Sequence, residues 1–294
     1  MLGADAFTTQ IKSLCFYIFD ESDTFIKKEI KHGPFSTNEF SFNLPDGKYK
    51  FVCIASSDNW DETSLYWNTP NGENSKFTSN DIKISLNGIT NGIISSELPS
   101  LWYASPASPC NKEEYLNIKE FGKDTVELNL IRNTNNIRLI IQNSNNTRKG
   151  HEDYSCEING ATNSVLDYSD KVISHEIFTY RPYFQTTETI NSEGIISNSN
   201  VFITEWDINR LMDNDKMRLT VKNKTTGKLI FDHALVPLLL MLQHEKYSNM
   251  PKQEYLDREY EYEFYLLLDN NDQWYQLVIK VNDWVLRLNR IDLN

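Results

Sequence analysis

The side chains of this chain that could do chemistry are mostly carboxylates, and some of them gather in three short acidic clusters. The clusters are Asp20–Asp23, Asp213–Asp215 and Asp269–Asp272. Calcium takes several oxygen ligands from one loop, but none of these clusters has the Gly and the terminal Glu of a full calcium loop. Solvated turns are therefore the favoured interpretation. A glycosidase needs two carboxylates at a set separation, and nothing among the 41 acidic residues singles out a pair.

No histidine has the spacing of a metal or catalytic site. The five His never stand three or four residues apart, so a zinc site would need ligands that only folding brings together. The chain also lacks a Gly-x-Ser-x-Gly elbow and a Gly-rich phosphate loop. We therefore predict no catalytic residue, no metal and no cofactor, and we expect a protein that is not an enzyme. The histidines are His32, His151, His175, His233 and His244.

The six Trp raise the possibility of carbohydrate binding, because the face of an indole stacks on the apolar face of a sugar. Trp60, Trp67 and Trp102 fall in expected long loops of the first half, where they could form an exposed platform. Loop aromatics of this kind also suit a protein contact. The other three, Trp206, Trp274 and Trp284, fall in or beside expected strands, where packing is the simpler interpretation.

The four Cys do not form a Cys-x-x-Cys unit. Cys15 and Cys53 each fall inside an expected strand, so buried free thiols are favoured, since an unpaired Cys behaves as a small hydrophobic residue. A Cys15–Cys53 bridge is the alternative. With Cys110 and Cys156 the chain allows three full pairings, and the sequence cannot choose among them.

The charge balance excludes several partners. The net charge is −12, which argues against nucleic acid and against charge-driven binding to an anionic membrane. The longest apolar run, Ala234–Leu242, is too short to span a bilayer. No charged-then-apolar leader opens the chain, so we expect any targeting signal to lie upstream of residue 1.

Alternating apolar residues and turn signals place most of the first half in strands. We expect a strand pair over Leu14–Phe19 and Phe25–Ile30. A hairpin is expected to join Glu39–Leu44 to Lys48–Ala55 through Pro45-Asp46-Gly47. Thr125–Ile131 is a further expected strand. Asn133 follows it and begins a polar interruption, where we place a domain boundary that gives residues 4–133 and 134–294.

The second half repeats this pattern. Tyr154–Ile158 is expected to end in an Asn159-Gly160 turn, and two later hairpins surround one helix over Ala234–Lys246. The class expected is all-β, with two tandem Greek-key β-sandwich domains and minor helix. The two hairpins are Met217–Lys222 with Lys228–Phe231, and Trp274–Val281 with Trp284–Asn289.

Eight motifs carry a resemblance over nearly the whole chain. In order they are Phe16–Asp20 with Phe25-Ile26, Leu44–Val52, Val126–Leu139, Tyr154–Gly160 with Tyr180-Arg181-Pro182, Lys216–Val221, Thr226–Phe231, Tyr255–Arg258 and Trp284–Asn289. Each motif is weak alone, but the ordered set is fairly specific. It resembles the anchor and minor-subunit lipoproteins of Bacteroidetes-type (type V) fimbriae.

The resemblance implies two transthyretin-like sandwiches and a lipidated N-terminal Cys in the outer membrane, exposed at the cell surface. Cys15 lies within an expected strand, so the lipid-bearing Cys is expected upstream of this chain. The resemblance also implies contact with fimbrial shaft subunits by strand donation, in which main-chain hydrogen bonds give affinity. Trp284, Leu286 and Leu288 share one face of the last strand and are the expected subunit-interface residues. Whether that strand is donated or completes its own sheet stays open.

These observations favour a non-catalytic fimbrial anchor or minor subunit that attaches a surface fimbria or limits its length. The alternative is a surface carbohydrate-binding lipoprotein that uses its loop aromatics. A surface or periplasmic hydrolase is a third hypothesis, which would need convergent carboxylates of split pKa. The position of the protein at base, shaft or tip is not decided by the sequence.

Overall fold

The structure, a computed structural model, describes residues 7–71, 77–105, 115–119, 122–191, 194–196 and 198–290. The chain forms two compact units. Unit 1 holds Met1–Gly88, Pro99–Thr134 and Asn163–His175, and unit 2 holds Ile89–Leu98, Asn135–Thr162 and Glu176–Asn294. Two contiguous domains at 4–133 and 134–294 differ from this arrangement, because each unit also takes a segment from the other half of the sequence.

Unit 1 is built on sheet A, in which strand β1 (Ser13–Asp20) is buried on both faces from Leu14 to Phe19. A polar turn follows it, in which the Asp20 Oδ1 atom accepts the N–H groups of Ser22 and Thr24 at 2.8 and 2.9 Å. The expected strand pair is confirmed, because β1 pairs antiparallel with β2 (Phe25–His32). The order of sheet A is β2 (Phe25–His32), β1 (Ser13–Asp20), β3 (Gly47–Ser56), β7 (Leu101–Ala104) and β9 (Ile131–Arg132), with β8 (Leu116–Ile118) paired to β3.

A small second sheet, sheet B, covers the face of sheet A that carries Tyr17 and Tyr103. The Tyr17 hydroxyl donates to the Pro70 carbonyl at 2.5 Å, and the Tyr103 hydroxyl donates to the Tyr168 carbonyl at 2.8 Å. The order of sheet B is β12 (Val165–Leu166), β5 (Ile84–Leu86) and β4 (Trp67–Asn68). The helical turns of unit 1 are α1 (Phe7–Gln10), α2 (Trp60–Thr63) and the 3₁₀ turn η1 (Ser79–Asp81).

Two segments on the opposite face of sheet A were expected to be strands, and the structure shows that they are not. Phe40, Phe42 and Leu128 pack on the buried cluster around Phe16, and side chains alternate between half-buried and exposed along 39–44 and 125–130. Yet among the residues that the structure describes, no backbone–backbone hydrogen bond joins 39–44 or 124–128 to another segment. The expected hairpin from 39–44 into β3 is therefore wrong. The alternation of apolar residues indicates which side chains face a core. It does not indicate whether the backbone forms hydrogen bonds with another strand.

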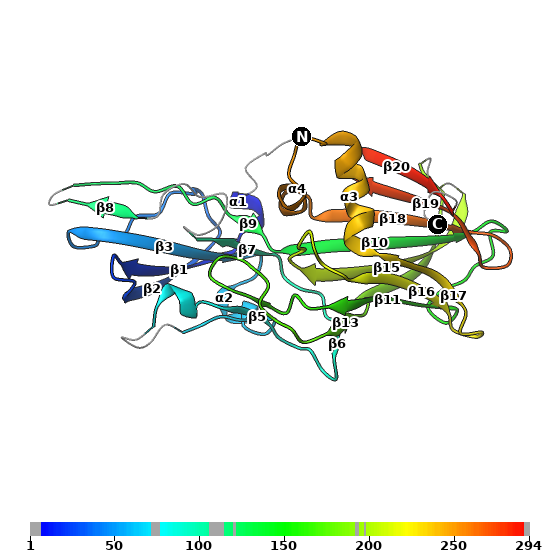
Figure 1. Ribbon diagram of the computed structural model, residues 1–294, viewed down its shortest axis with the longest axis horizontal. Coiled ribbons are helices and arrows are strands. Elements are labelled where there is room, and N and C mark those ends of the chain that lie inside the picture. Colours follow the sequence, from blue (N-terminus) through cyan, green and yellow to red (C-terminus); the bar gives the residue numbers. More distant parts are fainter. Residues whose placement is uncertain are drawn as a thin grey trace. The chain divides into compact units, whose positions relative to one another are not determined.

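Unit 2 is a sandwich of two larger sheets (Figure 1). Sheet D contains a parallel pair, in which residues 136–143 of β10 (Thr134–Asn143) lie in register with β18 (Glu261–Leu268). The order of sheet D is β14 (Phe184–Ile190), β15 (Ser199–Asn209), β10 (Thr134–Asn143), β18 (Glu261–Leu268), β19 (Trp274–Val281) and β20 (Trp284–Asn289). The order of sheet C is β17 (Leu229–Ala234), β16 (Arg218–Asn223), β11 (Tyr154–Ala161), β13 (Phe178–Tyr180) and β6 (Ile93–Ile94).

The expected hairpins β16–β17 and β19–β20 are confirmed, but the expected turn at Asn159-Gly160 is not. Strand β11 runs through both residues, and its pairing with β13 shifts register between Asn159 and Ala161. Gly160 has φ of 78°, a backbone conformation that glycine adopts without steric cost. The Asn-Gly pair therefore marks a β-bulge here and not the end of a strand.

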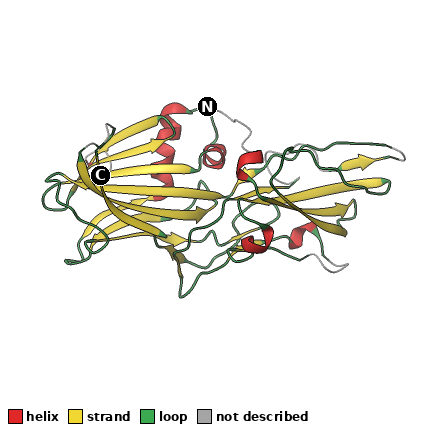
Figure 2. Cartoon of the chain, turned by 180° about the vertical axis from the view of Figure 1, so that it is seen from behind, coloured by secondary structure: helices red, strands yellow, loops and turns green. Residues whose placement is uncertain are grey.

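Helix α3 (Leu235–Lys246) matches the expected helix closely, with Ala234 as its N-cap. Pro237 lies in its first turn, where a missing N–H costs little because those groups have no partner within the helix. The helix packs against β17, β19 and β20. A second helix, α4 (Lys252–Arg258), was not expected. The helices are few and strands dominate both units, so the all-β sandwich class is confirmed (Figure 2).

Candidate functional site

The acidic clusters mainly cap turns. In the turn between β18 and β19, the Asp269 Oδ1 atom accepts the N–H groups of Asn271 and Gln273, both at 2.8 Å. Asp23 follows Asp20 in the β1–β2 turn and forms an ion pair with the buried Lys50 at 2.5 Å. Within the described ranges, no group of three or more His, Cys, Asp or Glu side chains could hold a metal ion.

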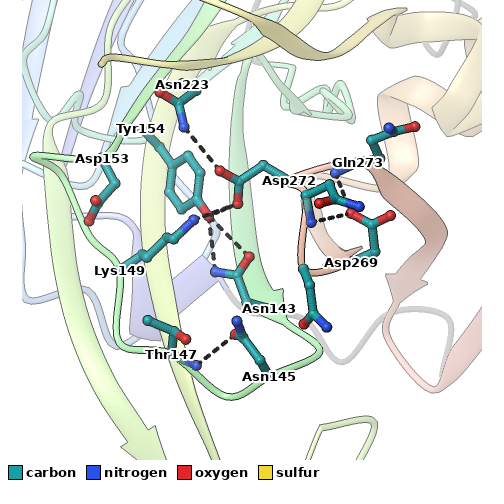
Figure 3. Close-up of polar contacts among 12 residues, drawn as sticks. Asn143, Asn145, Thr147, Lys149, Asp153, Tyr154, Asn223, Asp269, Asp272 and Gln273 are labelled. Carbon is teal, nitrogen blue, oxygen red and sulfur yellow. Dashed lines mark hydrogen bonds and ion pairs between the residues drawn. The ribbon is translucent and has the colours of Figure 1, made fainter. Parts of the chain in front are cut away.

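Asp272 is the exception, because it gathers side chains from the loop before β11, from the start of β11 and from the end of β16 (Figure 3). Its Oδ1 atom lies 2.6 Å from the Lys149 ammonium and 3.2 Å from the Tyr154 hydroxyl, and its Oδ2 atom accepts from the Asn223 amide at 3.0 Å. Burial alone would raise the pKa of Asp272, but these hydrogen bonds, with Lys149 foremost, hold it below the usual range. The Tyr154 hydroxyl also bonds to Asn143, and burial raises the pKa of that phenol. This arrangement holds loops together and leaves no carboxyl poised as a catalytic acid.

Asp215 has the raised pKa that a catalytic acid needs, but its carboxylate accepts the Met212 N–H and so closes a turn. Burial raises the pKa of Asp215 to about 6, against the opposing hydrogen bond from the Met212 N–H. Asp213 lies nearby and raises the pKa further. A glycosidase pair would need a second carboxyl of contrasting pKa across a cavity. The 2.8 Å bond to Met212 shows instead a carboxylate that closes a turn.

Trp60, Trp67 and Trp102 do not form the expected exposed platform. Their exposed fractions are 7%, 1% and 9%. Trp67 belongs to β4, the Lys28 ammonium lies 5.7 Å from the Trp60 ring centroid, and the Arg132 guanidinium lies 5.5 Å from that of Trp102. The polar sequence around them suggested loops, but the large apolar area of an indole favours burial even there.

The cysteines that the structure describes are buried free thiols. Cys15 pairs in register with Ile54, and Cys53 pairs with Phe16, so the two thiols lie on opposite faces of sheet A. A Cys15–Cys53 bridge is therefore wrong. Burial raises the pKa of Cys15 to about 12 and raises those of Cys53 and Cys156 as well, which makes the reactive thiolate rare. Cys110 lies outside the described residues.

The last strand, β20, completes its own sheet by pairing with β19. Trp284, Leu286 and Leu288 lie opposite Val281, Ile279 and Leu277, which are at most 3% exposed, so the three face the buried side of sheet D. Leu286 and Leu288 are half-buried, whereas Trp284 is 42% exposed. In the described part of the chain, β20 stands at one end of the sheet order.

The sequence did not reveal the surroundings of Trp284. The Trp284 Nε1 atom donates to the Tyr247 hydroxyl at 3.1 Å, and the Lys246 ammonium lies 4.9 Å from the indole ring centroid. Both partners come from the end of α3, far away along the chain. No local signal in the sequence could have predicted these contacts, because the two residues meet Trp284 only when α3 packs on β20.

Among the helices that the structure describes, none has the length and apolar character needed to span a membrane.

Comparisons with known proteins place the chain in a family. The family model described as fimbrillin-A associated anchor proteins Mfa1 and Mfa2 matches residues 1–290. A structure of a candidate adhesin from Bacteroides thetaiotaomicron is similar, with a TM-score of 0.79 and 26% identity over 97% of this chain and 93% of that one. No curated protein matches.

Two further structures are similar. One is a candidate polysaccharide-binding protein of Bacteroides thetaiotaomicron, with a TM-score of 0.78 and 26% identity over 98% of this chain and 94% of that one. The other is the fimbrial anchor protein Mfa2 from Porphyromonas gingivalis, with a TM-score of 0.65 and 18% identity over 94% of this chain and 90% of that one. The last likeness is one of fold. The family model covers nearly the whole chain, and the chain belongs to the family of fimbrillin-A associated anchor proteins Mfa1 and Mfa2.

Proposed function

We propose that this chain fixes a fimbria to the outer membrane through backbone pairing between a fimbrial shaft subunit and the outer edge of β20. Membership of the anchor family gives a fimbrial anchor or adhesin role, association with fimbrial subunits and a cell-surface location. The observation that carries the strand-mediated contact is the position of β20 at the end of the sheet order in the described residues. An edge strand presents unpaired backbone groups that a strand from another chain can use.

The turn before β20 fixes which backbone groups point outward. Asn282 and Asp283 form a two-residue hairpin loop, so the closing pair Val281–Trp284 exchanges both hydrogen bonds. Antiparallel pairs alternate between bonded and non-bonded, so Leu286 bonds back to β19, whereas Val285 and Arg287 direct their N–H and C=O groups away from it. An added strand would pair with these two residues.

Side chains would set the register of such a pairing. Trp284, Leu286 and Leu288 stay proposed interface residues, since an added strand would place alternate side chains beside them on the same face. A shaft-subunit strand with apolar residues at every second position would extend this half-buried face. A shaft-subunit strand shifted by one residue would turn its polar side chains toward this half-buried face.

Attachment to the outer membrane is proposed to use a lipid on a Cys upstream of this chain. The buried Cys15 in β1 is not a suitable carrier. The proposed role is structural, and catalysis forms no part of it.

The role is tested in the host by deleting the gene and measuring how fimbrial polymer divides between cells and culture medium. Polymer that is shed, or overlong on the cell, is the expected result, because the base would no longer be held. Polymer that stays attached at normal length would contradict an anchoring role.

The strand contact is tested by Arg287→Pro with Arg287→Ala as the matched control. Proline removes an outward N–H that β19 does not use, so the protein should still fold, whereas alanine removes the charged side chain and keeps that N–H. We expect the proline variant to release polymer and the alanine variant to retain it. A folded Arg287→Pro protein that holds polymer of normal length would refute pairing along β20.

A further inference from the structure

Strand β14 (Phe184–Ile190) is the second edge of sheet D, because in the described residues it stands at the opposite end of the sheet order from β20. The Glu205 carbonyl accepts the Tyr183 N–H at 3.0 Å, so Glu205 directs its backbone groups toward β14. Bonded and non-bonded positions alternate along an antiparallel pair, so Phe202 directs its backbone groups away from β14. Thr187 lies opposite Phe202, and its N–H and C=O therefore point outward at the middle of this edge.

The outward carbonyl of Thr187 is occupied by another part of the same chain. The Arg148 guanidinium donates to this carbonyl at 3.2 Å. Gly150 lies against the same residue, since a Cβ atom at this position would collide with the Thr187 Oγ1 atom. An added strand would need both this carbonyl and the space beside it.

The segment 146–150 is also held in place by contacts with elements other than β14. At its start, the Asn146 Oδ1 atom accepts the Asn200 N–H at 2.6 Å, and the Asn200 amide donates to the Asn146 carbonyl at 2.9 Å. Near its end, the Lys149 ammonium pairs with Asp272 at 2.6 Å (Figure 3). The segment therefore does not depend on β14 alone for its position.

The sequence of β14 suits pairing with a second copy of itself. Its Phe, Thr and Ile residues favour strands, and two such strands could pair antiparallel about Thr187. Gln185 would then face Thr189, and neither residue is charged. Glu188 would face Thr186, so no like charges would meet. An edge of this kind invites self-association, and natural proteins commonly prevent it with a covering loop or a charged side chain.

We infer that the segment 146–150 closes the β14 edge of sheet D and so prevents the chain from pairing with a second copy of itself. Arg148 is the specificity-determining residue, because it occupies the central outward carbonyl of that edge. Of the two edges that the described residues give sheet D, the closure leaves β20 for a partner, so the sheet admits one partner strand and not two. This last consequence rests on the proposed function, whereas the closure itself does not.

The closure is tested by sedimentation of the purified whole chain over a range of concentrations, without shaft subunits. The parent is the Arg287→Pro chain, whose β20 edge is blocked, so that self-association reports on β14 alone. The parent should be a monomer. Adding Arg148→Ala should tighten dimerisation by about tenfold or more, because two copies would no longer give up two Arg148 hydrogen bonds when they pair. The same comparison in the wild-type chain should give the same change.

Arg181→Ala is the matched control, because Arg181 is also an exposed arginine but pairs with Glu157 of sheet C. It should leave the chain monomeric. Two further changes, each added to Arg148→Ala, should restore the monomer. Thr187→Pro removes the outward N–H that a second β14 strand would use, and Thr187→Lys would set two like charges opposite each other.

The inference is overturned if Arg148→Ala stays monomeric, or if Arg181→Ala dimerises equally. It is also overturned if the parent chain already dimerises, or if neither change at Thr187 restores the monomer, since the contact would then lie elsewhere. None of these results involves a shaft subunit, so the anchoring role stands or falls separately in the host experiment.

Discussion

At the level of single residues, a buried ion pair joins Arg210 and Asp257 in unit 2. The Arg210 guanidinium donates to both carboxylate oxygens of Asp257 at 2.8 Å, and the two side chains are only 4% and 10% exposed. Gln253 donates to the same carboxylate at 2.9 Å. The Tyr255–Arg258 motif, quoted above for its family resemblance, therefore contains a residue that fastens α4 to the end of β15.

Asp257→Asn should destabilise the protein by about 3–5 kcal/mol, because it removes the negative charge that binds the buried Arg210 guanidinium in two places. Urea unfolding followed by circular dichroism measures the change in the free energy of unfolding. Glu254→Gln is the matched control, since the Glu254–Arg258 pair is 41% and 46% exposed and should be worth less than about 1 kcal/mol. Equal effects of the two substitutions would contradict the assigned role.

The buried carboxyl of Asp215 predicts that the stability of the protein depends on pH. Burial raises its pKa to about 6 in the folded state, above the ordinary value of about 3.9 in the unfolded chain. The folded state then binds more protons between these values, so stability falls as pH rises from about 4 to about 6 and stays lower above that. Asp215→Asn removes the buried charge but keeps an oxygen for the Met212 N–H.

The variant should therefore be more stable than wild type by roughly 1–2 kcal/mol at neutral pH, and the difference should vanish below about pH 4. Thermal or urea unfolding across this pH range measures it. A difference that is constant with pH would show that the carboxyl does not titrate as described.

At the scale of elements, Asp272 joins the two sheets of unit 2 at one end. Its partners come from the loop before β11, the end of β16 and the first residue of β11, while Asp272 itself stands between β18 and β19. The pKa of Asp272 is lowered, so its contribution to stability is present above about pH 4 and is lost as pH falls below that.

Asp272→Ala should cost about 2–3 kcal/mol of stability, because Lys149 loses its counterion in a partly buried position. Hydrogen exchange should quicken in residues 144–153 and 269–273 and stay unchanged in α4. Asp232→Ala is the control, since Asp232 pairs with Arg218 in an exposed position and should cost under about 1 kcal/mol. Unchanged exchange in the two loops would contradict the role of Asp272 as their common tie.

Local sequence patterns were sufficient to predict some of the helices and strands. The hairpins β1–β2, β16–β17 and β19–β20 and the helix α3 were predicted, because alternation, helical spacing and turn residues act between near neighbours. Segments 39–44 and 125–130 have the same alternation without a ladder. The difference lies in whether a second backbone comes within hydrogen-bonding distance, which no local pattern encodes.

At the scale of the whole molecule, the chain changes unit five times along its length. Residues 4–133 lack β12, which pairs with β5, and lack Asp170, whose carboxylate accepts from the Asn133 amide at 2.6 Å. Residues 134–294 lack β6, which pairs with β13, and lack Leu98, whose N–H donates to Asp207 at 3.0 Å.

Neither contiguous fragment should therefore fold to a stable unit, although each was expected from the sequence to be a domain. Circular dichroism and thermal unfolding of the fragments 4–133 and 134–294 measure this, with the full chain as reference. The full chain should unfold cooperatively, and the fragments should lack sharp transitions. Two fragments that each unfold cooperatively would restore the contiguous division.

Several features could be predicted from residue types and their order alone: the all-β class, the local hairpins, the long helix, the negative charge and the ordered motifs of the anchor family. Each of these follows from residue type or from the spacing of near neighbours. Three other features became visible only in the folded chain: the parallel pairing of β10 with β18, the burial of Trp60, Trp67 and Trp102, and the contacts among Lys149, Asn223 and Asp272. These features depend on contacts between segments far apart in the chain. Hydrophobic period and turn chemistry say that a strand has a buried face, but the packing of the whole core selects which strand or side chain covers it.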